Sequence, residues 1–228
     1  MPTSSILSIG FPAILASSVH DIKNSLTTLR ALLSKLEAIH QSPKPNEFKQ
    51  LEFETNRMNN SLMQLLTLYK IDLSQFSLAI DEHRAADILE DIVAQQSTLL
   101  ALSNIELITE CDSELFCYCD STLISNALCT LVNNSQRYCL GKVLISVTQE
   151  DDYIVFCIED DGKGYPENLI SSDYKQLPQL DVVTGNTGLG LFFAETIAQL
   201  HVQGKKRGFI ITDNNSQLGG ARFKLYLP

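Results

Sequence analysis

The sequence has few basic residues and no long apolar run. Its 17 lysines and arginines are outnumbered by 27 aspartates and glutamates, which gives a formal net charge of −10. A nucleic-acid-binding protein generally needs a basic face, so this balance argues against that class. No run of about 18 apolar residues is present, so no membrane-spanning helix is predicted. Residues 1–10 lack a basic region and a clear cleavage site, so we expect no signal peptide.

Metal-binding cysteine spacings are also missing, although the chain has six cysteines. Cys111, Cys117 and Cys119 lie closest together, but their spacing does not match a zinc site and no histidine is near them in sequence. Without a secretory signal, reduced thiols and a cytoplasmic location are expected. We therefore predict that the cysteines are buried as small apolar side chains.

The N-terminal third carries two series of apolar residues at helical spacing. The first steps by four and three residues through Leu15, Val19, Ile22, Leu26, Leu29, Leu33 and Leu36. The second, with one polar member, is Phe48, Leu51, Thr55, Met58, Leu62, Leu65 and Tyr69. A proline-containing segment, 41–46, separates them and predicts a helical hairpin.

Such a hairpin has too little core to stand alone. We expect two copies to pair as a four-helix bundle in a homodimer, the alternative being a bundle with the rest of the same chain. The hydrophobic period changes near Phe76, which predicts a domain boundary: a hairpin over 1–74 and a second domain over 75–228.

The second domain mixes helices and strands. Strands are expected at 76–80, 105–109, 115–119, 143–148, 153–158, 209–212 and 221–227, and helices at 85–102, 120–138 and 190–200. Residues 166–184 have little periodicity and predict a loop. Without a regular strand–helix–strand rhythm, this order predicts an α+β layered sandwich.

Three polar motifs in this domain contain residues that could bind a ligand. Asp160, Gly162 and Gly164 follow an apolar strand, where a carboxylate can accept a hydrogen bond from an exocyclic amine. On its own, this run is better explained as a hairpin turn. Gly188, Leu189 and Gly190 lead into a helix, and glycines at a helix N-terminus can cradle phosphate. The spacing matches neither a dinucleotide fingerprint nor a Walker A loop.

The third motif lies at the end of the 120–138 helix. Asn134 and Tyr138 are one turn apart, and Arg137 adjoins Tyr138. An amide oxygen can ligate Mg²⁺ and an arginine can pair with phosphate. Alone, these residues would be read as a polar helix end.

The order of the three motifs resembles the Bergerat-fold ATPases, the superfamily of sensor histidine kinases, Hsp90 and gyrase B. His20, Asp21 and Asn24 on the first helix narrow the resemblance to two-component histidine kinases. The resemblance covers about residues 14–228, and the closing segment 219–228 also fits it. It implies a dimerisation and phosphotransfer hairpin followed by an ATP-binding domain of the Bergerat type.

The resemblance also implies roles for individual residues. His20 is similar to the phosphoacceptor, Asp21 to the acid that orients the imidazole, and Asn24 to the residue that positions water for regulator dephosphorylation. Asn134 resembles the Mg²⁺ ligand, and Asp160 the acid that reads adenine. The remaining positions flank or cradle the nucleotide: Arg137, Tyr138, Gly162, Gly164, Gly188, Leu189 and Gly190.

We therefore expect an ATP- and Mg²⁺-dependent histidine kinase that phosphorylates His20 and passes the phosphoryl group to a response regulator receiver domain. A phosphatase activity towards the regulator, with Asn24 positioning the water, is also expected. No sensor domain precedes the hairpin, so we expect a separate sensor protein, unless the chain is a fragment. Asp160→Ala is expected to abolish ATP binding without loss of the fold, because a strand-end carboxylate is seldom needed for packing.

Some positions depart from the family pattern. Ser25 stands where proline is usual, and Thr130 where an asparagine often precedes the Mg²⁺ ligand by four. The alternative function is a histidine phosphotransferase whose nucleotide domain no longer binds ATP. An anti-sigma-type serine kinase is a third possibility, but it would leave His20 and the hairpin unexplained.

Overall fold

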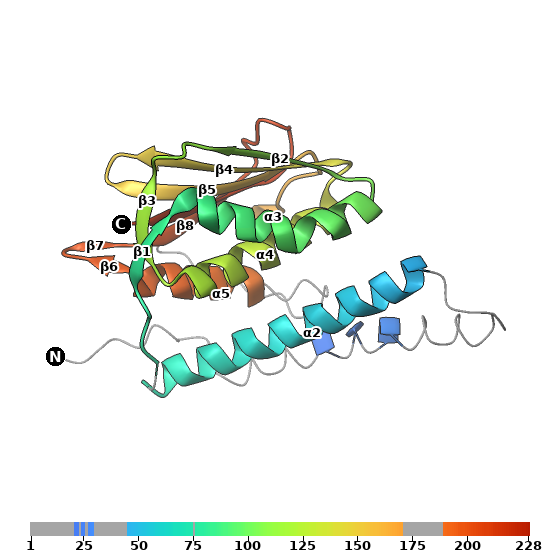
Figure 1. Cartoon of the computed structure of the whole chain (residues 1–228), viewed down its shortest axis with the longest axis horizontal. Coiled ribbons are helices and arrows are strands. Elements are labelled where there is room, and N and C mark those ends of the chain that lie inside the picture. Colours follow the sequence, from blue (N-terminus) through green and yellow to red (C-terminus); the bar gives the residue numbers. More distant parts are fainter. Residues whose placement is uncertain (1–20, 23, 26, 30–44, 75, 171–188) are drawn as a thin grey trace. The chain divides into compact units, whose positions relative to one another are not determined.

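The computed structural model describes residues 21–22, 24–25, 27–29, 45–74, 76–170 and 189–228. The chain divides into two compact units, one of residues 1–76 and 180–189 and the other of residues 77–179 and 190–228. Figure 1 shows the described elements along the chain. Each unit is considered by itself below.

The first unit is helical in its described part. The described residues between 21 and 29 are α-helical, and helix α2 runs from Pro45 to Asp72. A proline is well tolerated at the first helical position, because the N–H that it lacks would have no partner there. Helix α2 covers the second apolar series. In the described part of the chain, no helix is both long and apolar enough to cross a membrane.

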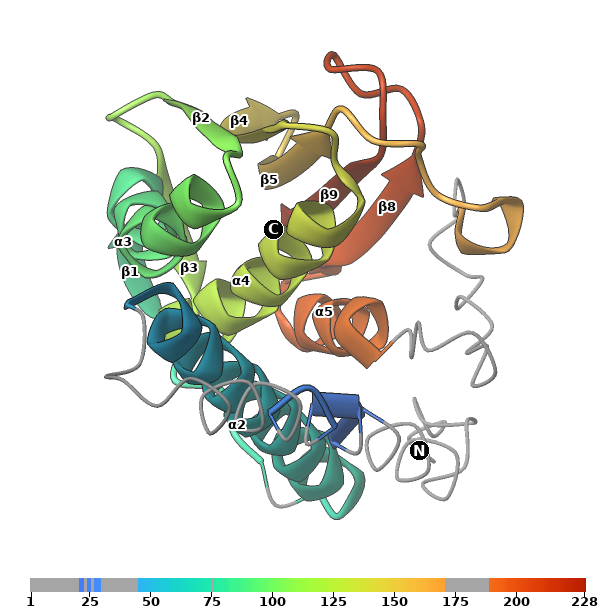
Figure 2. The same ribbon diagram turned by 90° about the vertical axis from the view of Figure 1, so that its right-hand side faces the viewer.

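The second unit is built on a mixed five-stranded sheet. Its strand order is β2 (Glu106–Cys111), β4 (Lys142–Glu150), β5 (Tyr153–Asp160), β9 (Arg222–Leu227) and β8 (Phe209–Asp213). β2 and β4 are parallel, and the other neighbours are antiparallel. Helices α3 (Ala85–Leu102), α4 (Ser121–Tyr138) and α5 (Leu189–Leu200) cover one face of the sheet (Figures 1 and 2). The predicted α+β sandwich is therefore present.

The core lies between this sheet and the three helices. Its largest fully buried side chains include Phe156 of β5, Phe193 of α5 and Phe223 of β9. Asp120 starts α4 as predicted, since its Oδ1 accepts a hydrogen bond from the N–H of Leu123 at 3.1 Å. This cap fixes where the helix that carries Asn134 begins.

Two short ribbons complete the unit and differ from the sequence prediction. The expected strand at 76–80 is wrong: strand β1 spans Asp81–Arg84 and pairs antiparallel with β3, Phe116–Cys119. The ribbon of β6 (Val202–Gln203) and β7 (Lys206–Arg207) was not predicted. Its strands have two residues each, too few for a period-2 pattern to be visible. A 3₁₀ turn, η1 (Glu167–Leu169), lies in the predicted loop.

His201 joins the end of α5 to the start of α4. Its side chain is buried, and its Nε2 accepts the N–H of Asp120 at 3.0 Å. Its Nδ1 lies 2.8 Å from the carbonyl of Ile197, so this nitrogen carries the proton. Burial lowers the pKa of His201, and both ring nitrogens are already engaged in the neutral form. This geometry gives His201 a structural role, because it ties the end of α5 to the start of α4.

Candidate functional site

Asp160 ends β5 with its carboxylate buried inside the turn that follows. Its Oδ1 accepts hydrogen bonds from the N–H groups of Gly162 at 2.9 Å and Ala221 at 3.1 Å. The side chain is only 3 % exposed. The reason given for the tolerance of Asp160→Ala does not hold here, because this strand-end carboxylate accepts hydrogen bonds from two main-chain N–H groups. Its second oxygen, Oδ2, stays outside these two bonds.

The glycines after Asp160 are required by close packing within the protein. A Cβ on Gly162 would lie 2.3 Å from the carbonyl oxygen of Tyr138. Gly164 has a φ of +81°, and its Cβ would lie 2.6 Å from Oδ1 of Asn214. Gly220, which the sequence analysis did not single out, would place a Cβ 2.5 Å from Asp160 Oδ1. The paired glycines before the closing strand were the available signal for it.

Asp161 ties this turn to the end of α4. Its Oδ1 accepts the N–H groups of Leu140, Gly141 and Lys142 at 2.8, 3.0 and 3.1 Å. Partial burial opposes its ionisation, but these main-chain donors outweigh it and lower the pKa of Asp161. Asp161 was not predicted to be a site residue, although it lies inside the motif. The clamp brings the exposed end of α4, with Arg137 and Tyr138, beside the 160–164 turn.

Asn134 lies on α4 where α5 approaches. A Cβ on Gly190 would lie 2.8 Å from Cγ2 of Thr130 and 3.5 Å from Nδ2 of Asn134. Figure 2 shows α4 and α5 running together across the sheet. Thr130 donates its hydroxyl hydrogen to the carbonyl of Asn126 at 2.9 Å. The structure therefore brings Asn134 next to Gly190, which are 56 residues apart in the sequence.

The chain leaving the 160–164 turn is held by β8 and the turn after it. Asn214 accepts the N–H of Tyr165 at 2.6 Å through Oδ1 and donates to its carbonyl at 2.9 Å through Nδ2. Thr212 donates to the carbonyl of Leu169 at 2.5 Å. These three bonds fix the segment up to residue 170.

Several predicted site residues belong elsewhere or lie outside the described residues. His20, Gly188 and residues 171–184 of the predicted loop lie outside them. Asp21 and Asn24 are helical and belong to the first unit. In that unit, Arg57 of α2 donates a hydrogen bond to the hydroxyl of buried Ser25. Arg57 also forms an ion pair with Glu54 at 3.0 Å.

Comparison with known proteins identifies the fold of the second unit. Residues 119–228 match the family model "Histidine kinase-, DNA gyrase B-, and HSP90-like ATPase". The virulence sensor histidine kinase PhoQ of Salmonella typhimurium is 24% identical over 211 residues, or 92% of this chain and 42% of PhoQ. The sensor protein PhoQ of Escherichia coli K12 is 23% identical over 212 residues. The chain thus spans less than half the length of these relatives.

Solved structures have the same fold. The Acinetobacter baumannii histidine kinase AdeS superposes with a TM-score of 0.62 at 22% identity, over 91% of this chain and 96% of AdeS. Histidine kinase ThkA, in complex with the response regulator protein TrrA, superposes with a TM-score of 0.61 at 20% identity, over 98% of this chain and 62% of ThkA. The predicted Bergerat-type ATPase domain is confirmed for residues 119–228, which match the family that histidine kinases share with DNA gyrase B and Hsp90.

Proposed function

We propose that this chain, which carries the ATP-binding domain of two-component sensor histidine kinases, transfers the γ-phosphoryl group of ATP to His20 and then to an aspartate of a response regulator. One observation carries the proposal. Buried Asp160 keeps Oδ2 outside its two main-chain hydrogen bonds, in the turn that Asp161 clamps to the end of α4. The matched ATPase family supports ATP as the phosphoryl donor, and the ThkA–TrrA complex supports a response regulator as the final acceptor.

Asp160 would read adenine through its free oxygen. A carboxylate oxygen accepts the hydrogen bond of the exocyclic amine, which guanine cannot offer at the same position. Arg137 and Tyr138 would flank the nucleotide, since the Asp161 clamp brings their helix end to this turn. Gly162 and Gly164 would shape the base side of the site.

The phosphates would lie towards the start of α5. Gly188, Leu189 and Gly190 would direct main-chain N–H groups and the helix dipole at them. In the described part of the chain, no group of three or more His, Cys, Asp or Glu could hold a metal ion. Mg²⁺ at Asn134 would therefore take its other ligands from phosphate and water, as this ion commonly does. It would neutralise the charge that builds up during transfer.

The helical part would supply the acceptor. We propose domain limits of 1–74 for the phosphotransfer hairpin and 75–228 for the ATP-binding domain. The hydrogen bond from Arg57 to Ser25 supports the hairpin, because it links α2 to the helical segment that follows His20. Asp21 would orient the imidazole of His20, and Asn24 would position water for dephosphorylation of the regulator.

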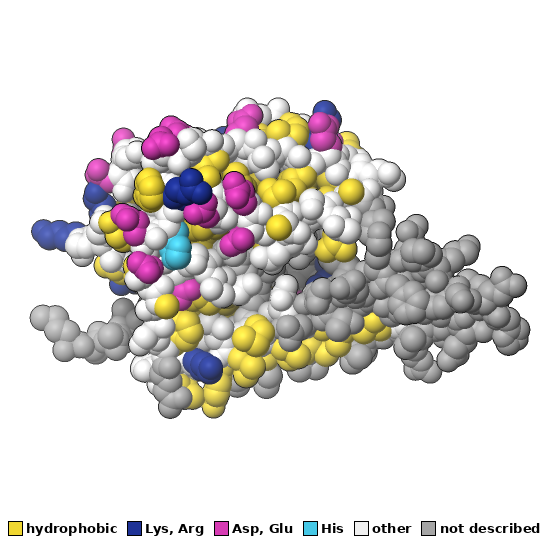
Figure 3. Space-filling view, in the orientation of Figure 1, with side chains coloured by type: hydrophobic (Ala, Val, Ile, Leu, Met, Phe, Trp, Pro, Cys, Tyr) yellow, Lys and Arg dark blue, Asp and Glu magenta, His cyan; other side chains and the backbone are white. Residues whose placement is uncertain are grey.

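Exposed apolar side chains on α2 support a homodimer. Leu62, Leu66 and Tyr69 recur at helical spacing and are each at least 41 % exposed. Figure 3 shows apolar side chains in a row along this helix. Because a monomer leaves this row in water, we propose that it packs against the same row of a second copy in a four-helix bundle.

The transfer step needs a neutral imidazole. Its unperturbed pKa is about 6.5, so the neutral form dominates at pH 7. A ring nitrogen of His20 attacks the γ-phosphorus, the bond to the oxygen of ADP breaks, and Asp21 takes the proton from the ring. Catalysis then consists mainly of positioning and charge neutralisation.

A histidine phosphotransferase remains the second candidate. It is favoured by Thr130, whose hydroxyl donates to the carbonyl of Asn126 at a position where the family often has asparagine. Such a protein would receive phosphate from another kinase without binding ATP itself.

A calorimetric titration with ATP·Mg²⁺ and GTP·Mg²⁺ separates the two candidates. The kinase proposal predicts saturable binding of ATP and at least tenfold weaker binding of GTP. Absence of ATP binding, together with acceptance of phosphate on His20 from another phosphorylated protein, would establish the phosphotransferase instead. If ATP binds, Asn24→Ala is expected to retain phosphorylation of His20 and to lose regulator dephosphorylation.

A further inference from the structure

Two cysteines of β3 lie close enough to react with each other. Cys117 and Cys119 are buried, at 3 % and 0 % exposure, while Phe116 and Tyr118 on the opposite side of the strand are exposed. The two sulfur atoms are 3.7 Å apart and in hydrogen-bond contact. The predicted burial is confirmed for this pair, for Cys129 and for Cys157, whereas Cys111 and Cys139 are only partly buried. The contact between the two sulfur atoms was not predicted.

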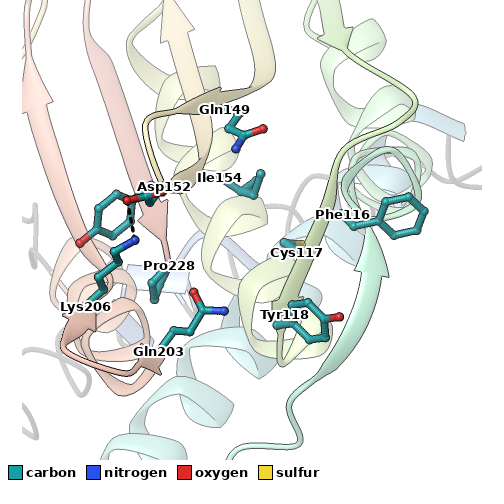
Figure 4. Close-up of a pocket in the computed structure, with 10 residues that line it drawn as sticks. Phe116, Cys117, Tyr118, Gln149, Asp152, Ile154, Gln203, Lys206 and Pro228 are labelled. Carbon is teal, nitrogen blue, oxygen red and sulfur yellow. Dashed lines mark ion pairs between the residues drawn. The ribbon is translucent and has the colours of Figure 1, made fainter.

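An open pocket of about 240 Å³ reaches Cys117. Its lining also includes Ile154 of β5 and Gln203 and Lys206 of the β6–β7 ribbon. In Figure 4, Cys117 points to the side of β3 on which Ile154 lies, and Phe116 points away from it. A small solute can therefore approach Cys117 from the pocket, while Cys119 is fully buried.

The surroundings assign different roles to the two thiols. Opposite Cys117 on β1 lies His83, whereas Asp81 lies opposite Cys119 and Asp120 follows it. The hydrogen bond between the sulfurs lowers the pKa of Cys117 and, with burial and the Asp120 charge, raises that of Cys119. Because the pocket reaches Cys117 and not Cys119, Cys117 is the thiol that meets a solute, and Cys119 behind it is the resolving thiol.

We propose that Cys117 and Cys119 form a reversible dithiol–disulfide site whose oxidant is a peroxide. The Cys117 thiolate attacks one oxygen of hydrogen peroxide, the O–O bond breaks, and the hydroxide released takes up a proton as water. The sulfenic acid left on Cys117 is attacked by the Cys119 sulfur, which expels a second water. In sum, two thiols lose two electrons and two hydrogens, and one peroxide becomes two waters. A small-molecule thiol reverses the reaction by disulfide exchange.

Closing the disulfide would act on the start of α4. Residues two apart in a strand have Cα atoms about 6.6 Å apart, near the upper limit of roughly 6.8 Å usual for disulfides. Bond formation must bring the two sulfur atoms from 3.7 Å to about 2.05 Å apart, which pulls on β3 next to Asp120. The N–H of Asp120 donates to His201, and its Oδ1 caps α4. This pull weakens both contacts, and the strained disulfide is readily reduced.

Peptide mapping of the full chain after peroxide treatment tests the site. Free thiols are blocked under non-reducing conditions, and chymotrypsin then cuts after Tyr118. The peptides carrying Cys117 and Cys119 are expected to remain joined until a reductant is added. Cys139→Ser, which removes a partly exposed cysteine elsewhere, is expected to give the same linked peptides. Cys119→Ser is expected to give none, and instead a sulfenic acid on Cys117 that dimedone traps.

Two outcomes would overturn the proposal. One is that all six thiols stay free at a peroxide concentration that oxidises free cysteine. The other is that the linked peptides join a different pair. If Cys119→Ser does not fold, the maps of the wild type and of Cys139→Ser still decide between these results. The oxidised wild type is also expected to melt at a lower temperature than the reduced form, and dithiothreitol should restore it. An unchanged melting temperature despite a Cys117–Cys119 bond would refute the coupling to α4.

Discussion

Replacing Asp160 with asparagine separates its structural role from its proposed role in nucleotide binding. The amide oxygen of asparagine can take the place of Oδ1 and keep the hydrogen bonds from Gly162 and Ala221. The amide NH₂ then replaces Oδ2, so a donor faces the exocyclic amine of adenine, which is also a donor. A hydrogen bond to a charged acceptor contributes about 1.5–3 kcal/mol, so ATP should bind about 10- to 100-fold more weakly.

Asp160→Ala should behave differently, because it removes both acceptors. The buried N–H of Ala221 and the partly buried N–H of Gly162 would lose their partner, at about 1–3 kcal/mol each. The sum, about 2–6 kcal/mol, is a large part of the roughly 5–15 kcal/mol that stabilises a typical domain. The alanine variant is therefore expected to lose stability together with ATP binding, whereas the asparagine variant loses mainly binding.

Calorimetric titration with ATP·Mg²⁺ and urea unfolding measure the two effects. Asp151→Asn is the matched control, since it makes the same chemical change in an exposed turn and should alter neither quantity. An Asp160→Asn variant that binds ATP as tightly as the wild type would refute the adenine-reading role. An Asp160→Ala variant as stable as the wild type would refute the structural role.

Three further predictions concern packing, pH and assembly. Gly190→Ala should destabilise the domain by about 1–3 kcal/mol, because its Cβ would overpack against Thr130. In a double-mutant cycle, Thr130→Ser should restore part of this loss. Helix propensity alone predicts that Gly190→Ala is more stable than the wild type, and that result would contradict the contact. Burial lowers the pKa of His201 below its unfolded value of about 6.5, so its neutral form stabilises the fold above that pH. That stability is lost as the pH falls towards the folded pKa; urea unfolding between pH 7.5 and 5.5 should show a smaller pH slope in His201→Gln. Leu62→Lys should shift the protein to monomers in light scattering, because burial of each leucine contributes about 1.5–3 kcal/mol to the dimer. Lys70→Gln, a change at an exposed position, should not. A wild type that is already monomeric at micromolar concentration would contradict the dimer.

Local patterns were sufficient for the longer elements of the second unit. Residues 85–102 form the predicted helix, the helix predicted at 120–138 corresponds to α4, and the apolar alternation at 143–148 and 153–158 corresponds to β4 and β5. In each case, the signal lies within one continuous segment. The order of the motifs along the chain likewise indicated the ATPase domain, and residues 119–228 match that family.

Contacts between distant segments could not be read from the sequence in this way. β1 pairs with β3, and β2 pairs in parallel with β4. Both pairings depend on how the intervening helices, α3 and α4, pack against the sheet. Asp161 was missed because its three donors lie about 20 residues away, after α4. Asp160 was assigned to the ligand alone, since its hydrogen bond to Ala221 forms only when β9 pairs with β5.

Labelling of the full chain with γ-³²P-ATP and Mg²⁺ tests the central claim most directly. The account predicts a phosphoryl group on His20 that is labile in acid and stable in alkali. His20→Gln should abolish the label and still bind ATP, because His20 is not among the residues proposed to hold the nucleotide. Wild-type protein that binds ATP·Mg²⁺ but never labels His20 would contradict the account.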